Sequence, residues 1–169
     1  VSRADQDAFA LRSQQRAASA EAEGRFDSQI VAVEIRQGRV PTVVARDEHP
    51  RADTTIEGLR RLGPVFRKTG GTVTAGNSSG ITDGAAATLV CSEDYASKMS
   101  LKPLARIRSY AVTGCAPEIM GIGPVASTRK ALERAGLKIS DIDIWELNEA
   151  FASQSLACID ELGLDTTKI

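Results

Sequence analysis

The sequence predicts an α/β fold in which helices and strands are layered on one another. The main indication is the order of elements from residue 85 onward, where apolar runs of strand length alternate with segments of helical spacing. A length of 169 residues is enough to bury a sizeable core. The composition, with 42% hydrophobic and 25% charged residues, is ordinary for a globular protein.

The first 24 residues predict a long helix. Ser2, with Asp5 three residues later, matches a capping box, in which the hydroxyl and the carboxylate satisfy free backbone amides of the first turn. The segment is rich in Ala, Gln and Arg, which favour helix, and Gly24 is expected to end it. Because Phe9 and Leu11 are its large apolar residues, we expect this helix to lie on another part of the protein rather than to form a core.

A hairpin and a second helix are predicted next. The β-branched runs 30–35 and 42–45 indicate two strands joined by a turn at 37–38. Thr54 with Glu57 repeats the capping-box pattern, so a helix is expected to begin at Thr54. Its apolar side chains recur at helical spacing at Ile56, Leu59, Leu62 and Phe66.

A glycine-rich stretch, residues 70–84, precedes the alternating half of the chain. Its small residues allow a ligand to approach the backbone closely, although a surface turn is the simpler interpretation. The predicted order after it is a strand at 85–92, a helix at 93–99, a strand at 105–112, a helix from 121 to 136, a strand at 142–147 and a helix from Asn148 to Gly163.

Charge and cysteine content exclude several classes of function. A net charge of -1 and an aromatic content of 4% argue against a nucleic-acid surface. Cys91, Cys115 and Cys158 contain no CxxC pair and, with His49 as the single histidine, are too few for most zinc sites, so no metal is expected. Such cysteines are typical of a reducing compartment, which predicts a cytoplasmic location, or an organelle in a eukaryotic source. Cys91 and Cys158 lie in apolar runs and are expected to be buried and unreactive. The longest apolar run, 85–91, is too short to span a bilayer.

Three short motifs match known patterns but lack the context that those patterns need. Residues 76–80 match GxSxG, the nucleophile elbow of α/β-hydrolases, which requires a histidine later in the chain, whereas His49 comes earlier and is expected to be a solvated loop residue. Residues 121–126 match the dinucleotide pattern GxGxxA, but residues 113–120 separate them from the preceding strand, which favours a simple Gly-Pro helix start. No P-loop pattern follows the glycines of 70–84.

Asn148 and Glu149 form the most informative polar pair. They follow the predicted strand at 142–147 directly, and ligands of open α/β sheets gather at the carboxyl ends of strands. A purely structural alternative is that Asn148 is the N-cap of the following helix and Glu149 lies in its first turn.

Here the sequence resembles a known family, the thiolases, which are acetyl-CoA acyltransferases. Residues 148–152, Asn-Glu-Ala-Phe-Ala, match the family's NEAFA motif. Residues 72–87 are similar to its TAGNxSGxxDGAA segment, 120–124 to its MGxGP turn, and 1–10 to the first helix of its loop domain. The resemblance covers essentially all 169 residues, in order.

The resemblance implies a thiolase fold, layered αβαβα, of which this chain is an internal fragment. Residues 1–81 would form most of the loop domain that contacts CoA, 82–100 the end of the N-terminal half, and 101–169 the start of the C-terminal half. The nucleophilic cysteine, the GHP histidine and the second, acid/base cysteine are then expected outside the chain, in a longer parent. That parent is expected to be a homodimer or homotetramer.

The resemblance also implies roles for individual residues. By this resemblance Asn148 would be the catalytic residue of the fragment, because the family's NEAFA asparagine holds a water that donates to the thioester oxygen. Ser79 would bind the pantetheine arm of CoA, and Arg51 one of its phosphates. The family's CoA contacts carry over to Arg51, Phe66, Ala75, Ser79, Met120, Ala150 and Phe151. Many members have alanine where this chain has Ser78.

The implied reaction is thiolytic cleavage of a 3-oxoacyl-CoA to acetyl-CoA and a shortened acyl-CoA, or the reverse Claisen condensation. CoA is then a substrate, and no tightly bound cofactor, nucleic acid or membrane is expected. The sequences of residues 47–51 and 147–150 most resemble those of the β-ketoadipyl-CoA type and of other broad 3-ketoacyl-CoA thiolases. Two alternatives stay open: a non-catalytic thiolase-like protein that binds CoA or lipid, and an interaction module.

Overall fold

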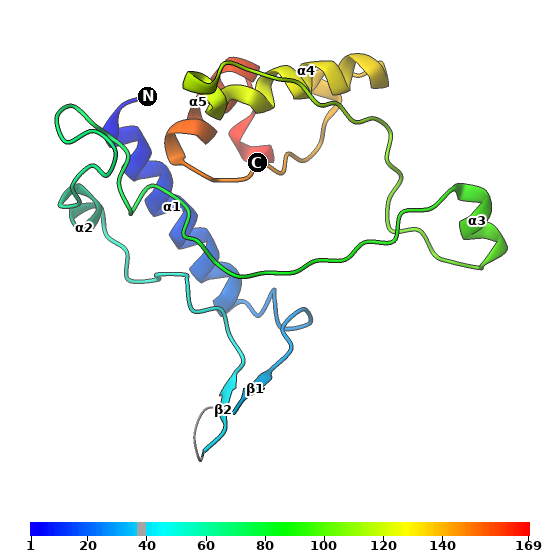
Figure 1. Ribbon diagram of the computed structural model, residues 1–169, viewed down its shortest axis with the longest axis horizontal. Coiled ribbons are helices and arrows are strands. Elements are labelled where there is room, and N and C mark those ends of the chain that lie inside the picture. Colours follow the sequence, from blue (N-terminus) through cyan, green and yellow to red (C-terminus); the bar gives the residue numbers. More distant parts are fainter. Residues whose placement is uncertain (37–39) are drawn as a thin grey trace. The chain divides into compact units, whose positions relative to one another are not determined.

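The computed structural model describes residues 1–36 and 40–169, which form two compact units (Figure 1). The first unit contains Val1–Gly80 and Asn148–Leu156, and the second contains Ile81–Leu147 and Ala157–Ile169. The elements are α1 (Arg3–Ala22), β1 (Val33–Ile35), β2 (Thr42–Val44), α2 (Ile56–Arg60), α3 (Glu93–Lys98), α4 (Gly123–Ala135) and α5 (Ala152–Leu162), with 3-10 turns at Pro117–Ile122, Ile139–Asp141 and Thr166–Lys168.

Helix α1 has the capping box that the sequence predicts. The Asp5 amide donates to the Ser2 hydroxyl at 3.1 Å, and the Ser2 amide donates to the Asp5 carboxylate at 3.3 Å. Gly24, just beyond the helix, has φ +67°, a conformation that glycine adopts without strain. The buried residues of α1 are Gln6, Asp7, Phe9 and Ala10. The prediction that α1 lies on other parts of the protein is confirmed, and two of its four buried residues are polar.

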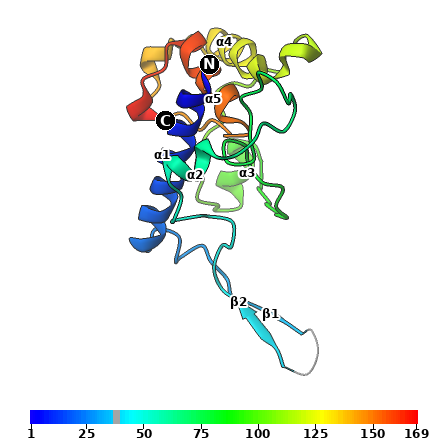
Figure 2. The same ribbon diagram turned by 90° about the vertical axis from the view of Figure 1, so that its left-hand side faces the viewer.

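Helix α2 begins one residue later than the sequence predicts. Thr55 is its N-cap and accepts a hydrogen bond from the Gly58 amide at 3.1 Å. The Thr54 hydroxyl instead donates to the Arg51 carbonyl at 2.7 Å, so it is occupied outside the helix. In α2 itself only Leu59 is buried, and Figure 2 shows this short helix beside α1.

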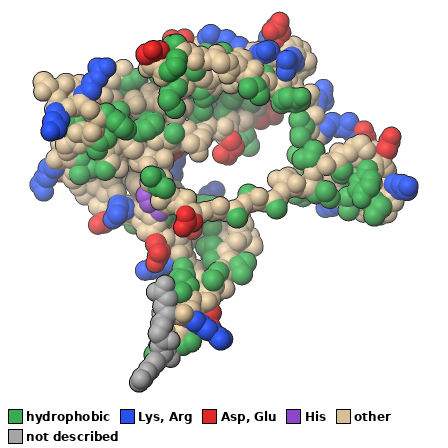
Figure 3. Space-filling model, in the orientation of Figure 1, with side chains coloured by type: hydrophobic (Ala, Val, Ile, Leu, Met, Phe, Trp, Pro, Cys, Tyr) green, Lys and Arg blue, Asp and Glu red, His purple; other side chains and the backbone are tan. Residues whose placement is uncertain are grey.

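The two predicted strands pair as an antiparallel hairpin. Val33 lies opposite Val44 and Ile35 opposite Thr42. The turn predicted at 37–38 lies outside the described residues. The hairpin extends away from α1 and α2 (Figure 2), and Figure 3 shows hydrophobic side chains on its surface. Val33, Ile35 and Val43 are exposed, whereas Val44 is half-buried.

The three strands predicted at 85–92, 105–112 and 142–147 are wrong as paired, buried strands. Within the described residues these segments belong to no sheet, and Val90 and Ile144 are 70% and 73% exposed. A strand is stabilised by hydrogen bonds to a neighbouring strand, and none lies beside these segments in the described chain. The backbone amide of Trp145 donates instead to the carbonyl of Lys168, in the 3-10 turn, at 2.8 Å.

The helices predicted between those segments are confirmed: α3 starts at Glu93 as predicted, and α4 starts two residues later than predicted. Helix α3 begins after Ser92, which caps it, and α4 begins at Gly123, with proline in its first turn. In the second unit α4 and α5 are joined by a hydrogen bond of 2.7 Å from the Arg129 guanidinium to the carbonyl of Glu161. The apolar core of this unit consists of Ala96, Val125, Cys158, Ile159, Leu162 and Leu164. No helix in the described ranges has the length and apolar character needed to cross a membrane.

Candidate functional site

The first unit contains a cavity of about 310 Å³ that four chain segments line. Helix α1 forms one wall, and the segment 49–50, the loop 76–79 and the segment 148–152 form the others. Two predicted site residues, Ser79 and Asn148, line this cavity together. Its lining residues are Phe9, Ala10, Ser13, Gln14, Ala17, His49, Pro50, Gly76, Asn77, Ser78, Ser79, Asn148, Glu149 and Ala152.

Backbone pairing between two loops sets the position of segment 148–152. The Ser79 amide donates to the Ala150 carbonyl at 3.0 Å, and the Ala152 amide donates to the Asn77 carbonyl at 2.9 Å. Between these two bonds, Ser78 and Phe151 form an isolated antiparallel bridge. Segment 148–152 is therefore held as an extended edge against loop 76–79.

Asn148 does not cap a helix. Helix α5 begins at Ala152, four residues later than predicted, so the N-cap interpretation of Asn148 is wrong. The physical reason is that the amide of Ala152 and the carbonyl of Ala150 already bond to the other loop. The Asn148 side chain is exposed and makes no hydrogen bond within the described part of the chain. Its amide is thus available at the cavity, with both donor and acceptor capacity.

Glu149 connects the Asn148 segment to α1. Its carboxylate accepts a hydrogen bond of 2.5 Å from the Ser13 hydroxyl, across 136 residues of sequence. Both side chains line the cavity. The sequence predicts a first-turn helical position for Glu149, and this is wrong for the same reason as for Asn148, since α5 begins after it.

The other predicted CoA contacts of the first unit lie around these loops. The Phe66 and Phe151 rings meet edge to face, with centroids 6.2 Å apart and an interplanar angle of 68°. Phe66 is 73% exposed, which leaves most of an apolar surface open to a ligand. Ala75 is exposed in the loop that precedes Asn77, and Ala150 is half-buried.

Arg51 and Met120 stand apart from the cavity lining. The Arg51 amide donates to the Gln14 side chain at 2.8 Å, which holds this residue next to Pro50 at the cavity wall. Its guanidinium forms no ion pair within the described chain. Met120 belongs to the second unit, in the 3-10 turn, where it is 73% exposed.

His49 lies closer to the candidate site than the sequence predicts. It is exposed, as a solvated loop residue would be, yet it lines the cavity. A Cβ on Gly80 would lie 2.3 Å from the His49 Cε1 atom, so the imidazole packs directly on the glycine backbone. No local pattern around residue 49 predicts this, because the contact joins segments 31 residues apart.

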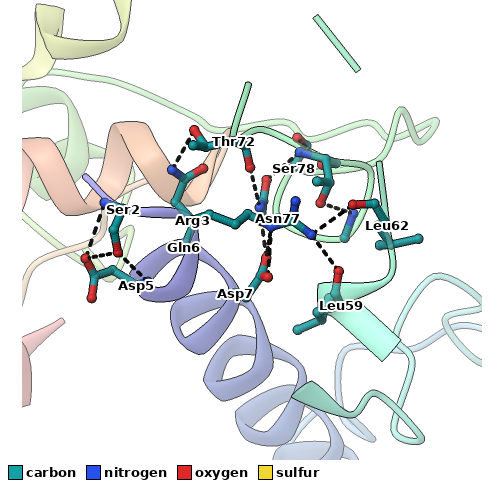
Figure 4. A network of polar contacts seen from close by, with 12 residues as sticks. Ser2, Arg3, Asp5, Gln6, Asp7, Leu59, Leu62, Thr72, Asn77 and Ser78 are labelled. Atoms are coloured by element: carbon teal, nitrogen blue, oxygen red, sulfur yellow. Dashed lines mark hydrogen bonds and ion pairs between the residues drawn. The ribbon is translucent and has the colours of Figure 1, made fainter. Parts of the chain in front are cut away.

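A buried polar network beside the cavity could not be predicted from the sequence either (Figure 4). Asp7 and Asn77 are 1% and 3% exposed, and the Asn77 amide donates to the Asp7 carboxylate at 3.0 Å. The spacing of Arg3 and Asp7, four residues apart on a helix, is the one signal in the sequence, since it predicts an ion pair. Nothing in the sequence indicates that Asn77 joins it.

Of the two cysteines predicted to be buried, one is buried and the other is exposed. Cys158 is fully buried, as predicted, and its thiol lies 3.4 Å from the Gly121 carbonyl. The prediction that Cys91 is buried is wrong, because its segment has no covering element in the described chain and the thiol is exposed. No group of His, Cys, Asp or Glu suited to a metal occurs in the ranges that the structure describes.

Comparison with known proteins decides the family. Residues 1–94 match the family model described as "Thiolase, N-terminal domain", and residues 101–169 match "Thiolase, C-terminal domain". The chain belongs to the thiolase family. The resemblance read from the short motifs is thereby confirmed over nearly the whole chain.

Similar thiolases come from several bacteria. The chain is 56% identical to the β-ketoadipyl-CoA thiolase of Pseudomonas aeruginosa, over all of this chain and 42% of that protein. It is 54% identical to the 3-ketoacyl-CoA thiolase of Aliivibrio fischeri, over 97% of this chain and 43% of that protein. The chain therefore spans about two fifths of the length of these relatives.

Solved thiolase structures share the fold. The crystal structure of Bacillus anthracis acetyl-CoA acetyltransferase matches with a TM-score of 0.93 at 49% identity, covering 99% of this chain and 42% of that one. Human mitochondrial 3-ketoacyl-CoA thiolase in complex with CoA matches with a TM-score of 0.89 at 48% identity, covering 99% and 41%. The predicted fold class, an α/β thiolase fold, is confirmed. Within the described residues, the part of that fold present here consists of helices and a small two-stranded sheet.

Proposed function

We propose that this chain is the CoA-contacting part of an acyltransferase that cleaves 3-oxoacyl-CoA with a second CoA, or runs the reverse condensation. The observation that carries the proposal is the free amide of Asn148 beside Ser79 at one cavity. The names of the similar proteins, 3-ketoacyl-CoA and β-ketoadipyl-CoA thiolases, support 3-oxoacyl thioesters as the substrate class. The relatives quoted are named as enzymes, which favours catalysis over non-catalytic binding of CoA or lipid.

Asn148 supplies the oxyanion stabilisation in this proposal. Attack of a thiolate on the keto carbonyl, and of CoA on the acyl-enzyme, both place negative charge on an oxygen. A water held by the Asn148 amide can donate a hydrogen bond to that oxygen in a fixed direction. The side chain suits this role because no helix cap and no other group of the described chain occupies it.

The nucleophile lies outside the three cysteines of this chain in the proposal. Cys158 is fully buried, and neither Cys91 nor Cys115 lines the cavity. An activated thiolate needs a base or a cation beside it, and the histidine that the family resemblance implies for this role is expected in the rest of the parent chain. The nucleophilic cysteine, the histidine and the acid/base cysteine then belong to the rest of a longer parent chain.

CoA binds along the loops of the first unit in this proposal. Ser79 donates to or accepts from the pantetheine arm, Phe66 and Phe151 offer an apolar edge, and the small Ala75 and Ala150 let the arm pass. Arg51, whose guanidinium is not engaged in an ion pair, reaches a phosphate. Met120 adds an apolar surface from the second unit.

The proposed organisation assigns 1–81 to the loop domain, 82–100 to the end of the N-terminal half and 101–169 to the start of the C-terminal half. The parent is then a cytoplasmic homodimer or homotetramer. Gel filtration of the parent tests the oligomer directly.

Purified parent protein, mixed with a 3-oxoacyl-CoA and CoA, tests the reaction by chromatography of the acetyl-CoA formed. Ser79→Ala is expected to raise the KM for CoA roughly 3- to 10-fold, the cost of one hydrogen bond. Ser78→Ala is the matched control with a smaller effect, because its hydroxyl is engaged with the Thr74 carbonyl at 2.8 Å. CoA binding without any acetyl-CoA would reject the enzyme in favour of a binding protein.

A further inference from the structure

Every polar atom of the Asn77 side chain is used in the protein interior. Its amide nitrogen donates to the Asp7 carboxylate at 3.0 Å and to the Thr72 carbonyl at 3.1 Å. Its oxygen accepts from the Thr74 amide at 2.8 Å (Figure 4). With 3% of its surface exposed and both amide hydrogens engaged, the Asn77 side chain joins parts of the protein interior.

Asp7 fixes this side chain to two helices. The Arg3 guanidinium approaches the Asp7 carboxylate at 2.8 and 3.0 Å, and it also donates to the carbonyls of Leu59 and Leu62 at 2.7 and 3.0 Å. A carboxylate that is 1% exposed is tolerated because these partners satisfy it. The pair therefore connects α1, the end of α2 and the 72–79 loop.

The backbone of the same loop carries the candidate site. The carbonyl of Asn77 itself holds the amide of Ala152, and two residues later the Ser79 amide holds the carbonyl of Ala150. Asn148 makes no hydrogen bond of its own within the described chain, so its position depends on this pairing and on the hydrogen bond of the neighbouring Glu149 to Ser13. A shift of Asn77 would move Ser79 and Asn148 together.

We infer that the buried Asp7–Asn77 pair is a positioning pair that sets where Ser79 and Asn148 lie at the cavity. The inference rests on the proposed function for its kinetic consequences and on the hydrogen bonds alone for its structural ones. Neither residue touches substrate in this account. Asparagine suits position 77 because the site needs two donors and one acceptor on a short side chain, which aspartate and leucine do not supply.

The test compares Asn77→Ala with a matched control in the parent protein. Gln6→Ala is the control, because Gln6 is 1% exposed on the same helix and donates to Thr72 at 2.9 Å, but has no bond to Asn77. Both variants are expected to lower Tm. Only Asn77→Ala is expected to lower kcat, on the order of 10- to 100-fold, because small displacements of reacting groups are costly.

A second, milder variant keeps the inference testable if Asn77→Ala does not fold. Asp7→Asn retains an oxygen that accepts from Asn77, whereas Asp7→Ala does not. We expect Asp7→Asn to keep a larger share of kcat than Asp7→Ala, because only Asp7→Asn keeps an acceptor for the Asn77 amide. Equal losses of kcat in these two variants would contradict the positioning role.

Amide hydrogen exchange gives a readout that does not need activity. Asn77→Ala is expected to speed exchange of the Ser79 and Ala152 amides, while Gln6→Ala leaves these two amides unchanged. The positioning role would be overturned if both variants lost kcat in proportion to their loss of Tm. It would also be overturned if Asn77→Ala left exchange of the Ser79 and Ala152 amides unchanged. An inactive wild-type parent would reject the proposed function, and the exchange result would still decide the inference.

Discussion

Ser2 and Asp5 show how two exposed side chains fix the start of a helix. The carboxylate of Asp5 accepts hydrogen bonds from the hydroxyl and the amide of Ser2, and these bonds lower the pKa of Asp5 below its ordinary value of 3.8. A carboxyl with a lowered folded-state pKa stabilises the fold above its unfolded-state pKa, and this contribution is lost as the pH falls through the folded-state value. The capping box should therefore be weakened by acid.

Asp5→Asn is expected to lower the free energy of unfolding of the parent at pH 7. The difference from wild type should begin to shrink below about pH 3.8, where Asp5 of the unfolded chain takes up a proton, and should disappear as the pH falls through the lower folded-state pKa. Urea unfolding between pH 7 and 3 measures it. Glu57→Gln is the control, since Glu57 forms no capping box in α2. A difference that is the same at all these pH values would show that the charge of Asp5 plays no part.

At the scale of elements, local signals predicted the helices and failed where the partner is distant in sequence. The starts of α1 and α3 follow from capping residues within three positions of the helix. The start of α5 does not, because bonds to Asn77 and Ser79, more than 70 residues away, hold the backbone that would otherwise extend the helix. The predictions of buried strands fail for the same reason, because a strand needs a neighbouring strand and the sequence of one segment does not specify that neighbour.

The loop that carries Ser79 packs closely on α2 through Gly76. A Cβ at Gly76 would lie 2.5 and 2.6 Å from methyl groups of Leu59 and Leu62. Leu59 is buried, so it has little room to move away. The absence of a side chain at Gly76 is therefore what allows α2 and the loop to meet.

Gly76→Ala is expected to lower the free energy of unfolding by about 1–3 kcal/mol, the usual cost of overpacking. Gly63→Ala is the matched control, because a Cβ at Gly63 would meet no atom within 4 Å. It is expected to change the free energy of unfolding by less than about 0.5 kcal/mol. Urea unfolding of both variants gives the comparison. Equal stability of the two variants would contradict the close packing of the loop.

For the molecule as a whole, family membership could be predicted from short motifs, whereas the arrangement of the candidate site could not. The motif at 148–152 and the loop at 72–81 carry the resemblance, and the structure pairs them by backbone hydrogen bonds. The motifs do not reveal the buried pair beneath them, because Asp7 and Asn77 are 70 residues apart and each looks like an ordinary surface residue in sequence. Buried polar pairs of this kind emerge only from tertiary structure.

The central claim is that Asn148 acts in turnover rather than in holding CoA or the fold. Steady-state thiolysis by the parent carrying Asn148→Ala tests it most directly. Removal of one oxyanion donor is expected to lower kcat on the order of 100-fold, while the Kd for CoA and Tm stay close to those of wild type. Unchanged kcat in the folded variant would contradict the account.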